Sequence, residues 1–486
     1  MAFGPVVTSG SGASAARARR DTVLLALLGA VLFVTLKLQQ WHTFGVHAEL
    51  AEFESRLYST LHGGLLSRHR DEASFLGEHV SPVLLLLVPL YALLPSPLTL
   101  LVLQALAAAA AVIPLHRLAL HLLEQRAAAA AIGVAYLVSR ILSYGLMYDF
   151  HMEIFYPILF FAAFLAFEQR RWGTMAATIV LAAMCKEDAG LAIAGFGLYV
   201  FARGARGAGT LLFTGGLVWL IVAVTLVSPA FRNPAAGHAY PFVSYWSGYG
   251  RTQPEILRGM LNPLTHARVL FTARKLGQSF DLFAGFLGLP FATAAAAVFL
   301  VLPGWFILYS SDNPTMNGPI IYYGLLILPF LFYGALLGIR RMAGGGPAAR
   351  ARWTLALACG VLLVQLGNSR IFKQLSPAAF RPNPRAAVAR AMIAQVPRGA
   401  QVSAQVDLVS HLPVQCERYF LPEGLGGAAF ALFDTLGNPW PLDPQRNREL
   451  LAGLETSGAW ERDAAGSGFV LLRRRLAGPP PGAGRN

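Results

Sequence analysis

The sequence predicts an all-α polytopic membrane protein with a small α/β domain at its C-terminal end. Two features of the composition point to the membrane: 55% of the 486 residues are hydrophobic and only 13% are charged, whereas soluble domains carry about 25% charged residues. The apolar residues also gather in long runs separated by short basic or polar segments. The last ~115 residues return to soluble composition.

The apolar runs predict a transmembrane domain over residues 21–368. The first span is expected at 21–38. Further runs follow at about 97–116, 128–144, 154–168, 173–185, 189–202, 209–228, 320–338 and 353–367, with two short runs between 280 and 309. The stretch 80–95 is short and rich in proline, and we expect it to enter the membrane and return. The count is then about eleven transmembrane helices.

Charge placement sets the expected topology. Basic pairs such as Arg170 and Arg171 follow the ends of apolar runs, and cytoplasmic loops are rich in Lys and Arg. Residues 1–20, small, polar and basic, are predicted to be a disordered cytoplasmic N-terminus. The first outer loop 39–80, the large outer loop 229–278 and the C-terminal domain then lie outside the cell. These features predict a multi-pass membrane protein whose N-terminus is cytoplasmic.

The first outer loop carries an amphipathic pattern. Leu50, Phe53, Leu57 and Leu61 recur at helical spacing, which predicts a helix with this stripe in lipid and its charges in water. Glu52 stands four residues before Arg56 and is expected to pair with it.

Two glutamates of this helix have no evident partner within it. Glu49 and Glu54 could each act as a general base toward an acceptor hydroxyl, or hold a metal. A solvated helix face explains them equally well.

Three further groups of ionisable residues stand at the ends of apolar runs, where charges are costly and often functional. His79 could bind phosphate or shuttle a proton, unless the backbone satisfies it. Asp149, His151 and Glu153 are more than a loop requires. The Asp149–His151 pair could orient a substrate hydroxyl or ligate a divalent cation, although a polar helix cap is the simpler alternative.

Lys186 opens the third group. Lys186 could neutralise a lipid phosphate, with Glu187 or Asp188 compensating its charge, and a structural ion-pair network is an equal alternative. In loop 229–278, aromatic residues such as Tyr245 and Trp246 favour an interfacial belt over a sugar-stacking platform. No other cofactor is indicated. The net charge of +14 is scattered, so no nucleic-acid surface is predicted.

The stretch 384–475 predicts the small α/β domain. Two helical patterns, AAVARAMIAQV and RELLAGLETSG, the second ending at Gly458, alternate with four strand-like runs, AQVSAQV, RYFLP, AAFALFDTL and GFVLLRR. The tail 476–486, rich in proline and glycine, is predicted to be disordered.

Several longer motifs together resemble the bacterial family known as domain of unknown function 2079, which is similar to the C-type (GT-C) glycosyltransferases. The resemblance covers most of residues 44–340 and rests on ELAEFESRLYSTLHGG, GEHVSPVLLLLVPLYALLPSPLTLLVLQA, YDFHMEIFYPILFF, CKEDAGLAIAGFGLYV and SSDNPTMNGPIIYYGLLILPFLF. The last motif adds Tyr323 to the candidate substrate-binding residues. The resemblance implies an inverting transferase that takes a sugar from a polyprenyl-phosphate donor on the outer face, with the catalytic acid in the first outer loop.

One departure from the family pattern concerns that acid. The first-loop acids of the family are aspartates, and Glu49 and Glu54 occupy those places here, which keeps the charge and adds a methylene.

The leading hypothesis is therefore a glycosyltransferase embedded in the lipid bilayer, acting on a glycan, lipid or protein acceptor. Glu49 would be the base and Glu54 its alternate, while His79, Asp149, His151, Glu153, Lys186 and Tyr323 would bind substrate. The alternative is a lipid or solute transporter or a non-catalytic membrane scaffold, since buried charges beside a split span also suit transporters. No internal repeat of the transporter kind is evident.

Overall fold

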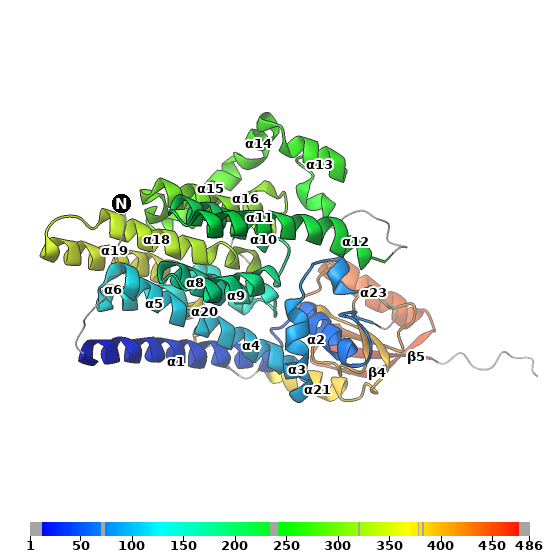
Figure 1. The fold of residues 1–486 in the computed structure, drawn as a ribbon. Coiled ribbons are helices and arrows are strands. Elements are labelled where there is room, and N and C mark those ends of the chain that lie inside the picture. The colour runs from blue at the N-terminus through cyan, green and yellow to red at the C-terminus, as the bar shows by residue number, and fades with distance from the viewer. Residues whose placement is uncertain are drawn as a thin grey trace, which may run out of the picture. The chain divides into compact units, whose positions relative to one another are not determined.

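The computed structural model describes residues 12–69, 73–233, 242–318, 321–377, 379–381 and 383–475. It divides into two compact units (Figure 1). The helical unit comprises Met1–Leu36, Ala73–Leu86 and Val102–Leu375. The sheet unit comprises Lys37–Glu72, Leu87–Leu101 and Ser376–Asn486. The helices α1, α3 and α4 each contribute residues to both units.

The helical unit is built from helices that pair along the chain. Its main helices are α1 (Gly12–His42), α4 (Pro97–Ala110), α5 (Val112–Leu123), α6 (Arg126–Leu137), α7 (Arg140–Met147), α8 (Tyr156–Glu168), α9 (Trp172–Ala183), α10 (Ala189–Ala202), α11 (Arg206–Val222), α16 (Leu302–Ser310), α18 (Leu328–Met342) and α19 (Pro347–Asn368). Shorter ones are α12 (Ser228–Ala230), α13 (Gln253–Met260), α14 (Pro263–Leu270), α15 (Ala273–Ala284), α17 (Pro314–Asn317) and α20 (Ile371–Gln374). Short 3₁₀-helical or π-helical turns connect them at Phe75–Gly77, Met152–Phe155, Ala223–Val227, Val243–Trp246, Leu289–Ala292, Ala296–Val301 and Tyr322–Leu325.

Five helices among the described residues are long and apolar enough to cross a membrane. They are Ala13–His42, Pro97–Leu123, Arg126–Met147, Arg206–Ala230 and Pro347–Asn368. Four shorter apolar helices, among them α9 and α10, also fall within predicted spans or the short runs between them. The total of about eleven spans, and the re-entrant course of 80–95, stay predictions. Helix α3 (Val83–Leu93) has 11 residues, about 16 Å at 1.5 Å per residue, against a hydrocarbon core of about 30 Å.

The centre of the helical unit is α18, in which nearly every residue from Leu328 to Ile339 is buried. Aromatic side chains fill the space around it. The ring of Phe164 stacks on Tyr333 with centroids 4.6 Å apart and meets Phe330 edge-on at 5.1 Å. Such aromatic pairs add stability beyond the apolar area they bury.

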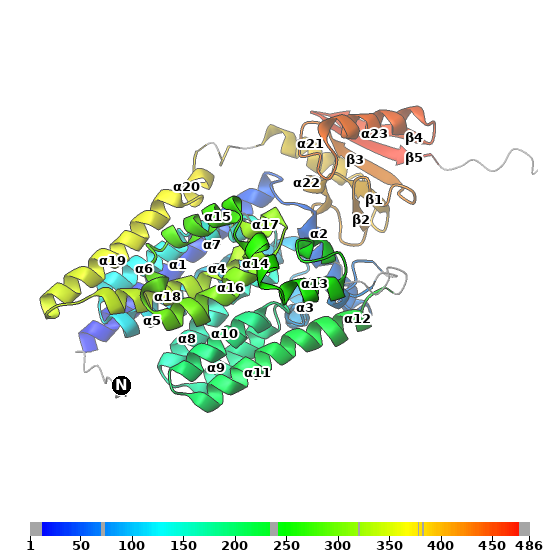
Figure 2. The same ribbon diagram turned by 90° about the horizontal axis from the view of Figure 1, so that it is seen from above.

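Helices α10 and α11 form a hairpin held by glycines (Figure 2). A Cβ atom added at Gly190 would lie only 2.5 Å from the main-chain oxygen of Gly216. The two backbones therefore touch directly, as small residues allow between membrane helices.

The sheet unit contains a five-stranded mixed sheet with the order β2-β1-β3-β5-β4. Its strands are β1 (Gln401–Ala404), β2 (Glu417–Phe420), β3 (Phe430–Asp434), β4 (Trp460–Gly466) and β5 (Phe469–Arg474). Strand β1 is parallel to β2 and β3, with Val402 opposite Phe430, and β5 is antiparallel to β3 and β4. Four strands confirm the sequence prediction. Strand β4, which is mostly exposed, was not predicted.

Helices cover both faces of this sheet (Figure 2). They are α21 (Pro384–Ile393), α22 (Val406–Val409) and α23 (Pro444–Thr456), joined by α2 (Ala48–Leu61) from the first loop. Both predicted helices are confirmed, and each starts at a capped proline. Asn383 accepts from the amide of Arg385, and Asp443 accepts from those of Gln445 and Arg446.

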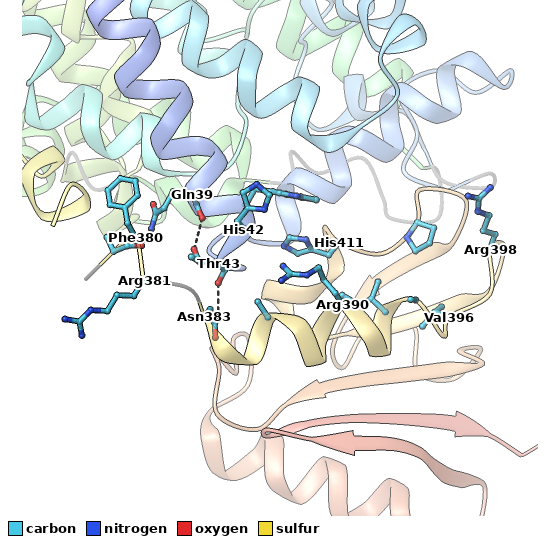
Figure 3. A pocket seen from close by; sticks show the side chains of 16 residues that line it. Gln39, His42, Thr43, Phe380, Arg381, Asn383, Arg390, Val396, Arg398 and His411 are labelled. Carbon is cyan, nitrogen blue, oxygen red and sulfur yellow. Dashed lines mark hydrogen bonds between the residues drawn. The ribbon is translucent and has the colours of Figure 1, made fainter. Parts of the chain in front are cut away.

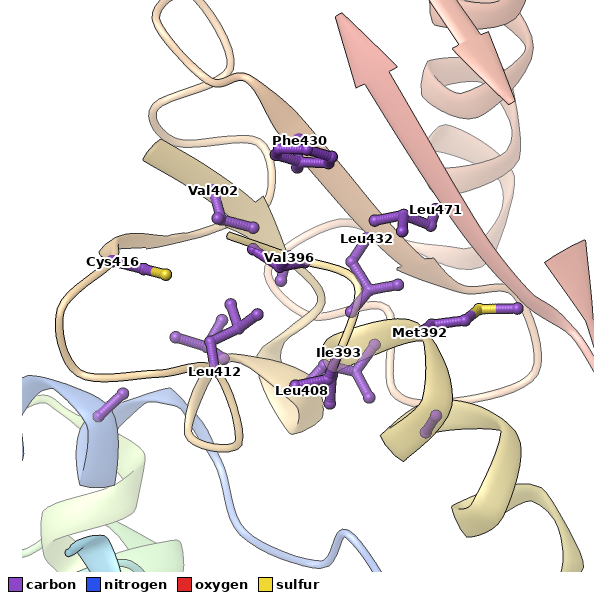
Figure 4. Packing of buried hydrophobic residues seen from close by; sticks show 14 of the residues in the cluster. Met392, Ile393, Val396, Val402, Leu408, Leu412, Cys416, Phe430, Leu432 and Leu471 are labelled. Carbon is purple, nitrogen blue, oxygen red and sulfur yellow. The ribbon is translucent and has the colours of Figure 1, made fainter. Parts of the chain in front are cut away.

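The α21 side of the sheet borders a pocket next to the end of α1 (Figure 3). Beneath it lies the main core, where Ile393 and Leu408 pack against Val402 and Leu432 (Figure 4). Ala48 and Ala51 of α2 belong to the same core. On the other face, Phe433 and Leu472 pack with Trp460 and the leucines of α23.

Three expectations need correction. The charges of α2 were expected in water, but Glu54 and Arg56 are buried. The prediction was wrong because the helix packs on the sheet unit, where its polar side also finds partners.

The prediction that residues 1–20 are disordered is wrong for residues 12–20. They form the start of α1, because their alanines and arginines favour helix and extend the span. Residues 1–11 and the tail 476–486 lie outside the described residues.

The described parts of the segment 229–278, residues 229–233 and 242–278, are more ordered than a polar loop. They hold α13, α14 and the start of α15, which begin at capping residues Thr252, Asn262 and Thr272. Each cap accepts a hydrogen bond from a backbone amide of its helix.

Candidate functional site

Four charged side chains of the helical unit converge from distant parts of the chain. His79 follows the tight turn Phe75–Gly77, Glu153 lies in the turn Met152–Phe155, and Lys186 and Glu187 stand between α9 and α10. Three successive charged residues interrupt the apolar run at 186–188. Helix α9 ends just before them, and each of the three side chains binds a different partner.

Lys186 is neutralised by Glu153. Its Nζ donates to Oε1 of Glu153 over 3.0 Å, and the two residues are 5% and 2% exposed. The ammonium also lies 5.8 Å and 5.4 Å from the ring centroids of Tyr322 and Tyr323, within the range of cation–π attraction. A buried pair with this geometry keeps Lys186 charged inside the protein.

The carboxylate of Glu187 contacts His79: Oε1 lies 2.8 Å from Nδ1 of His79, and Oε2 accepts from the amide of Val80 over 2.9 Å. Glu187 also lies close enough to Lys186 for its negative charge to offset part of that positive charge, as one alternative supposed. The ring of His79 stacks on Phe242, with centroids 4.6 Å apart. A carboxylate on Nδ1 favours a proton there and orients the ring, so that Nε2 is the ring atom left for a ligand.

Asp188 accepts a hydrogen bond from the hydroxyl of Tyr156 over 2.8 Å. Three consecutive residues thus contact two other segments of the helical unit, one around His79 and one from Glu153 to Tyr156. This rigid network fixes the polar end of a cavity.

The cavity has a volume of about 660 Å³ and two chemically distinct parts. Charged and aromatic side chains form one part: His79, Lys186, Glu187, Asp188, Arg232, Tyr245, Trp246 and Tyr323. Apolar side chains form the other, chiefly Leu220, Ile221 and Val224 at the end of α11 and Ile307 and Met316 facing them in the lining. Such a cavity suits an amphiphile that has an anionic head and a hydrocarbon chain.

Of the six predicted substrate-binding residues, His79, Lys186 and Tyr323 line this cavity. Glu153 reaches it only through Lys186. His151 stacks on Tyr322 with centroids 3.6 Å apart, and its Nδ1 lies 3.3 Å from the main-chain oxygen of Asp149. Asp149 is fully buried, and the amide of Gln104 donates to its main-chain oxygen.

Glu49 and Glu54 belong to the sheet unit. Glu54 is 2% exposed; it accepts from Arg418 over 2.7 Å and from the hydroxyl of Tyr91 over 3.2 Å. Arg418 also donates to the main-chain oxygen of Ala51 and to Ser55. Glu49 lies in the first turn of α2 and is half-buried. The expected pair of Glu52 and Arg56 is confirmed at 3.1 Å.

Within the described part of the chain, no group of three or more His, Cys, Asp or Glu residues is arranged to hold a metal ion. A divalent cation at Asp149 and His151 therefore stays a prediction.

The candidate residues predicted from the sequence do not include Arg232 and Arg418. Arg232 donates to Gly77 and Ser228 beside the cavity. It is the first basic residue after the apolar run of α11, a signal that could have identified it. Arg418 lies 364 residues from Glu54, and nothing in the local sequence points to the pair.

Comparison with known proteins agrees with this fold. A family model described as "predicted membrane protein (DUF2079)" matches residues 49–466. Among the solved structures, the crystal structure of ArnT from Cupriavidus metallidurans bound to undecaprenyl phosphate is similar, with a TM-score of 0.53 and 13% identity. The match covers 94% of this chain and 99% of that one. A sequence comparison with curated proteins gives no significant match.

The likeness to ArnT confirms the GT-C-like fold that the sequence motifs predicted. The family match spans both units, from the first turn of α2 to the end of β4. The chain thus belongs to the DUF2079 family of predicted membrane proteins.

Proposed function

We propose that this protein is an integral membrane glycosyltransferase of the bacterial inner membrane. It transfers a sugar from a polyprenyl-phosphate donor to a glycan, lipid or protein acceptor on the extracytoplasmic face. One observation carries the proposal: a single cavity of the helical unit is lined by ionisable side chains, among them Lys186 and Arg232, and by apolar side chains of a candidate span.

The apolar wall suits the lipid part of the donor. Leu220, Ile221 and Val224 belong to Arg206–Ala230, a helix whose surface is mostly exposed and apolar. In a bilayer that surface faces hydrocarbon, so a polyprenyl chain could enter the cavity sideways without crossing water.

The cationic end suits the donor phosphate. Lys186 and Arg232 carry positive charge and can donate hydrogen bonds to the phosphate oxygens. When the acceptor oxygen attacks the anomeric carbon, the bond from that carbon to the phosphate oxygen breaks and its electron pair stays on the phosphate. Preorganised cations stabilise this developing charge, which is commonly the largest contribution to such catalysis.

The aromatic residues of the lining suit the sugar. Tyr245, Trp246 and Tyr323 stand beside the cationic end of the cavity and can stack on a sugar ring. Residues outside the lining hold these side chains in place: His151 stacks on Tyr322, and Glu153 binds Lys186. Asp149 contacts His151 through its main-chain oxygen.

Glu49 is the proposed base that takes the proton of the acceptor hydroxyl, with Glu54 as its alternate. Glu49 is half-buried and Glu54 is 2% exposed, so an acceptor hydroxyl can approach Glu49 more easily. The sheet unit would recognise the acceptor.

Topology follows from the charges that flank the spans. Arg170, Arg171, Arg203 and Arg206 stand at one end of α8 to α11 and favour the cytoplasm. The N-terminus would then be cytoplasmic, and Lys186 and the sheet unit extracytoplasmic. The ArnT structure supports the choice of donor, because undecaprenyl phosphate, bound there, is a polyprenyl phosphate.

Native mass spectrometry of the purified protein tests the proposal. We expect polyprenyl phosphate to remain bound to the wild type and to be lost from Val224→Trp, which fills the apolar part of the cavity. Leu226→Trp is the matched control, because Leu226 is on the same helix but 63% exposed and outside the cavity lining. Equal retention by both variants would show that the lipid does not occupy this cavity.

A further inference from the structure

A second pocket, in the sheet unit, shares no lining residue with the cavity of the helical unit. It has a volume of about 990 Å³ and lies among the end of α1, the segment before α21, α21 itself and the loop after α22. Hydrogen bonds tie these walls together: Thr43 donates to the main-chain oxygen of Gln39, and Asn383 donates to that of Thr43 (Figure 3).

The lining of this pocket is basic. It includes His42, Arg381, Arg390, Arg398 and His411, and among its described residues there is no Asp or Glu. Figure 3 shows His42, His411 and Arg390 close together, with Arg381 and Arg398 toward opposite ends. Three arginines that share a pocket without a lining carboxylate repel one another and are stabilised when an anion binds.

Acidic residues near the pocket are already engaged elsewhere. Asp407 lies 3.0 Å from Nδ1 of His47. Asp434 binds Arg385. For Arg390 the described part of the chain provides a cation–π contact with Phe44 at 6.0 Å and no ion pair. The positive charge of the pocket is thus available to a ligand.

One polar atom of the lining also lacks a partner. The ring of His411 packs between Trp41 and Phe44, with centroids 4.0 Å and 3.9 Å away. Its Nε2 is buried, and among the described residues it has no hydrogen-bond partner. A buried polar atom without a partner is costly, and an oxygen of a bound anion would satisfy it.

The depth of the pocket in the membrane follows from α1. This helix is apolar and long enough to span a bilayer, and its last residues, Gln39 to His42, line the pocket. Trp41 among them is typical of the membrane–water interface. Phe380, which lies beside Gln39, is 44% exposed (Figure 3). These positions put the basic lining at the level of lipid headgroups.

We propose that this pocket binds the phosphate headgroup of an anionic phospholipid at the membrane surface. The guanidinium group of Arg390 contacts the phosphate oxygens, Arg398 adds positive charge toward one end of the pocket, and the acyl chains extend from the pocket into the bilayer. The site would anchor the sheet unit to anionic lipid, independently of the proposed transferase reaction.

Thermal unfolding of the full chain in detergent tests this site. The probes are short-chain phosphatidylglycerol, phosphatidylcholine with the same chains, and inorganic phosphate. We expect phosphatidylglycerol to raise the melting temperature of the wild type in a saturable way and phosphatidylcholine to have no effect. In R390Q/R398Q the half-saturating concentration should rise about 25-fold, since each basic residue near a lipid surface contributes about fivefold.

The matched control is R448Q, which removes an exposed arginine of α23 outside the pocket and should respond like the wild type. An unchanged response of R390Q/R398Q would overturn the proposal, provided that its melting temperature without lipid equals that of the wild type. If that temperature is lowered, R398Q alone repeats the test, with an expected rise of about fivefold. A saturable response to inorganic phosphate together with none to phosphatidylglycerol would overturn the lipid as the ligand.

Discussion

Both units bury an ion pair between residues far apart in the sequence, but the surroundings of the two pairs differ. In the sheet unit, Arg418 binds Glu54 and also donates to Ala51 and Ser55, so the guanidinium is enclosed by protein. In the helical unit, Lys186 binds Glu153 on one side and borders a cavity on the other. Burial of a charge is thus not enough to mark a functional site. The adjoining cavity distinguishes the second pair from the first.

The largest effect is expected from Glu49, because we propose that Glu49 and not the enclosed Glu54 is the general base. For Glu49→Gln we expect sugar transfer to fall by about 10²–10⁴-fold, the usual contribution of a general base, with stability unchanged. Complementation of a strain that lacks the native gene, scored by surface glycan, measures the effect. Full complementation by Glu49→Gln would exclude Glu49 as the base and would favour a transporter of the same lipid.

The enclosed pair should act on stability. Arg418→Met leaves the carboxylate of Glu54 buried without its cation, which we expect to lower the free energy of unfolding by about 3–5 kcal/mol. Denaturant unfolding of the purified protein measures this. The control, Arg462→Gln, removes a surface pair with Glu455 and should change stability by less than about 1 kcal/mol. If Arg418→Met lowered the free energy of unfolding as little as Arg462→Gln, the Arg418–Glu54 pair would not be enclosed by protein.

The pair beside the cavity should act on binding. The double variant Lys186→Gln/Glu153→Gln removes both charges together, so no lone buried charge remains. We expect the fold to persist and the affinity for polyprenyl phosphate to fall at least about tenfold, because a charged hydrogen bond to phosphate is worth about 1.5–3 kcal/mol. Native mass spectrometry with titrated lipid measures the loss. Unchanged affinity would place the phosphate elsewhere.

A smaller effect concerns the pH dependence of the sheet unit. Burial, together with the positive charges of Arg390 and His42, lowers the pKa of His411 to about 3. In the unfolded chain His411 takes up its proton near pH 6.5. Between these two pH values only the unfolded chain binds this proton, so stability decreases as the pH falls below about 6.5.

Melting temperatures at pH 7.5 and 5.5 measure this effect, which we expect to be about 1 kcal/mol. His411→Phe should flatten the pH dependence, and His62→Gln, at an exposed position, should keep it. A dependence that His411→Phe leaves unchanged must come from another group.

The sequence predicted the elements whose signals are local. The buried run FALFD formed the central strand β3, and the proline and glycine that flank RELLAGLET bounded α23. Strand β4 was missed because its residues ERDAAG are polar, as befits the edge strand of a sheet. Thr252 to Glu255 is a capping box that could have revealed α13 within the outer loop.

The candidate site was predictable only as separate charges. His79 and Lys186 stood out because charges are costly beside apolar runs. Their partners could not be deduced, since Glu187 lies 108 residues from His79 in the chain and Glu153 lies 33 from Lys186. The neighbouring carboxylates were the natural candidates to bind Lys186, but the turn before α10 directs Glu187 to His79 and Asp188 to Tyr156.

The glycine contact between α10 and α11 has a consequence for the lipid that the cavity accepts. Gly190 lies one turn after Lys186, and Gly216 lies one turn before Leu220, so the contact joins the charged end of the cavity to its apolar wall. Because the two backbones touch there, neither helix can slide along the other without a clash. For the proposed donor, main-chain contact and not adaptable side chains would therefore set the distance between the phosphate and the first isoprene units. Exchange of Gly190 or Gly216 for alanine should therefore change which lipids fit the cavity. Relatives that use different lipid carriers would be expected to differ at these two positions.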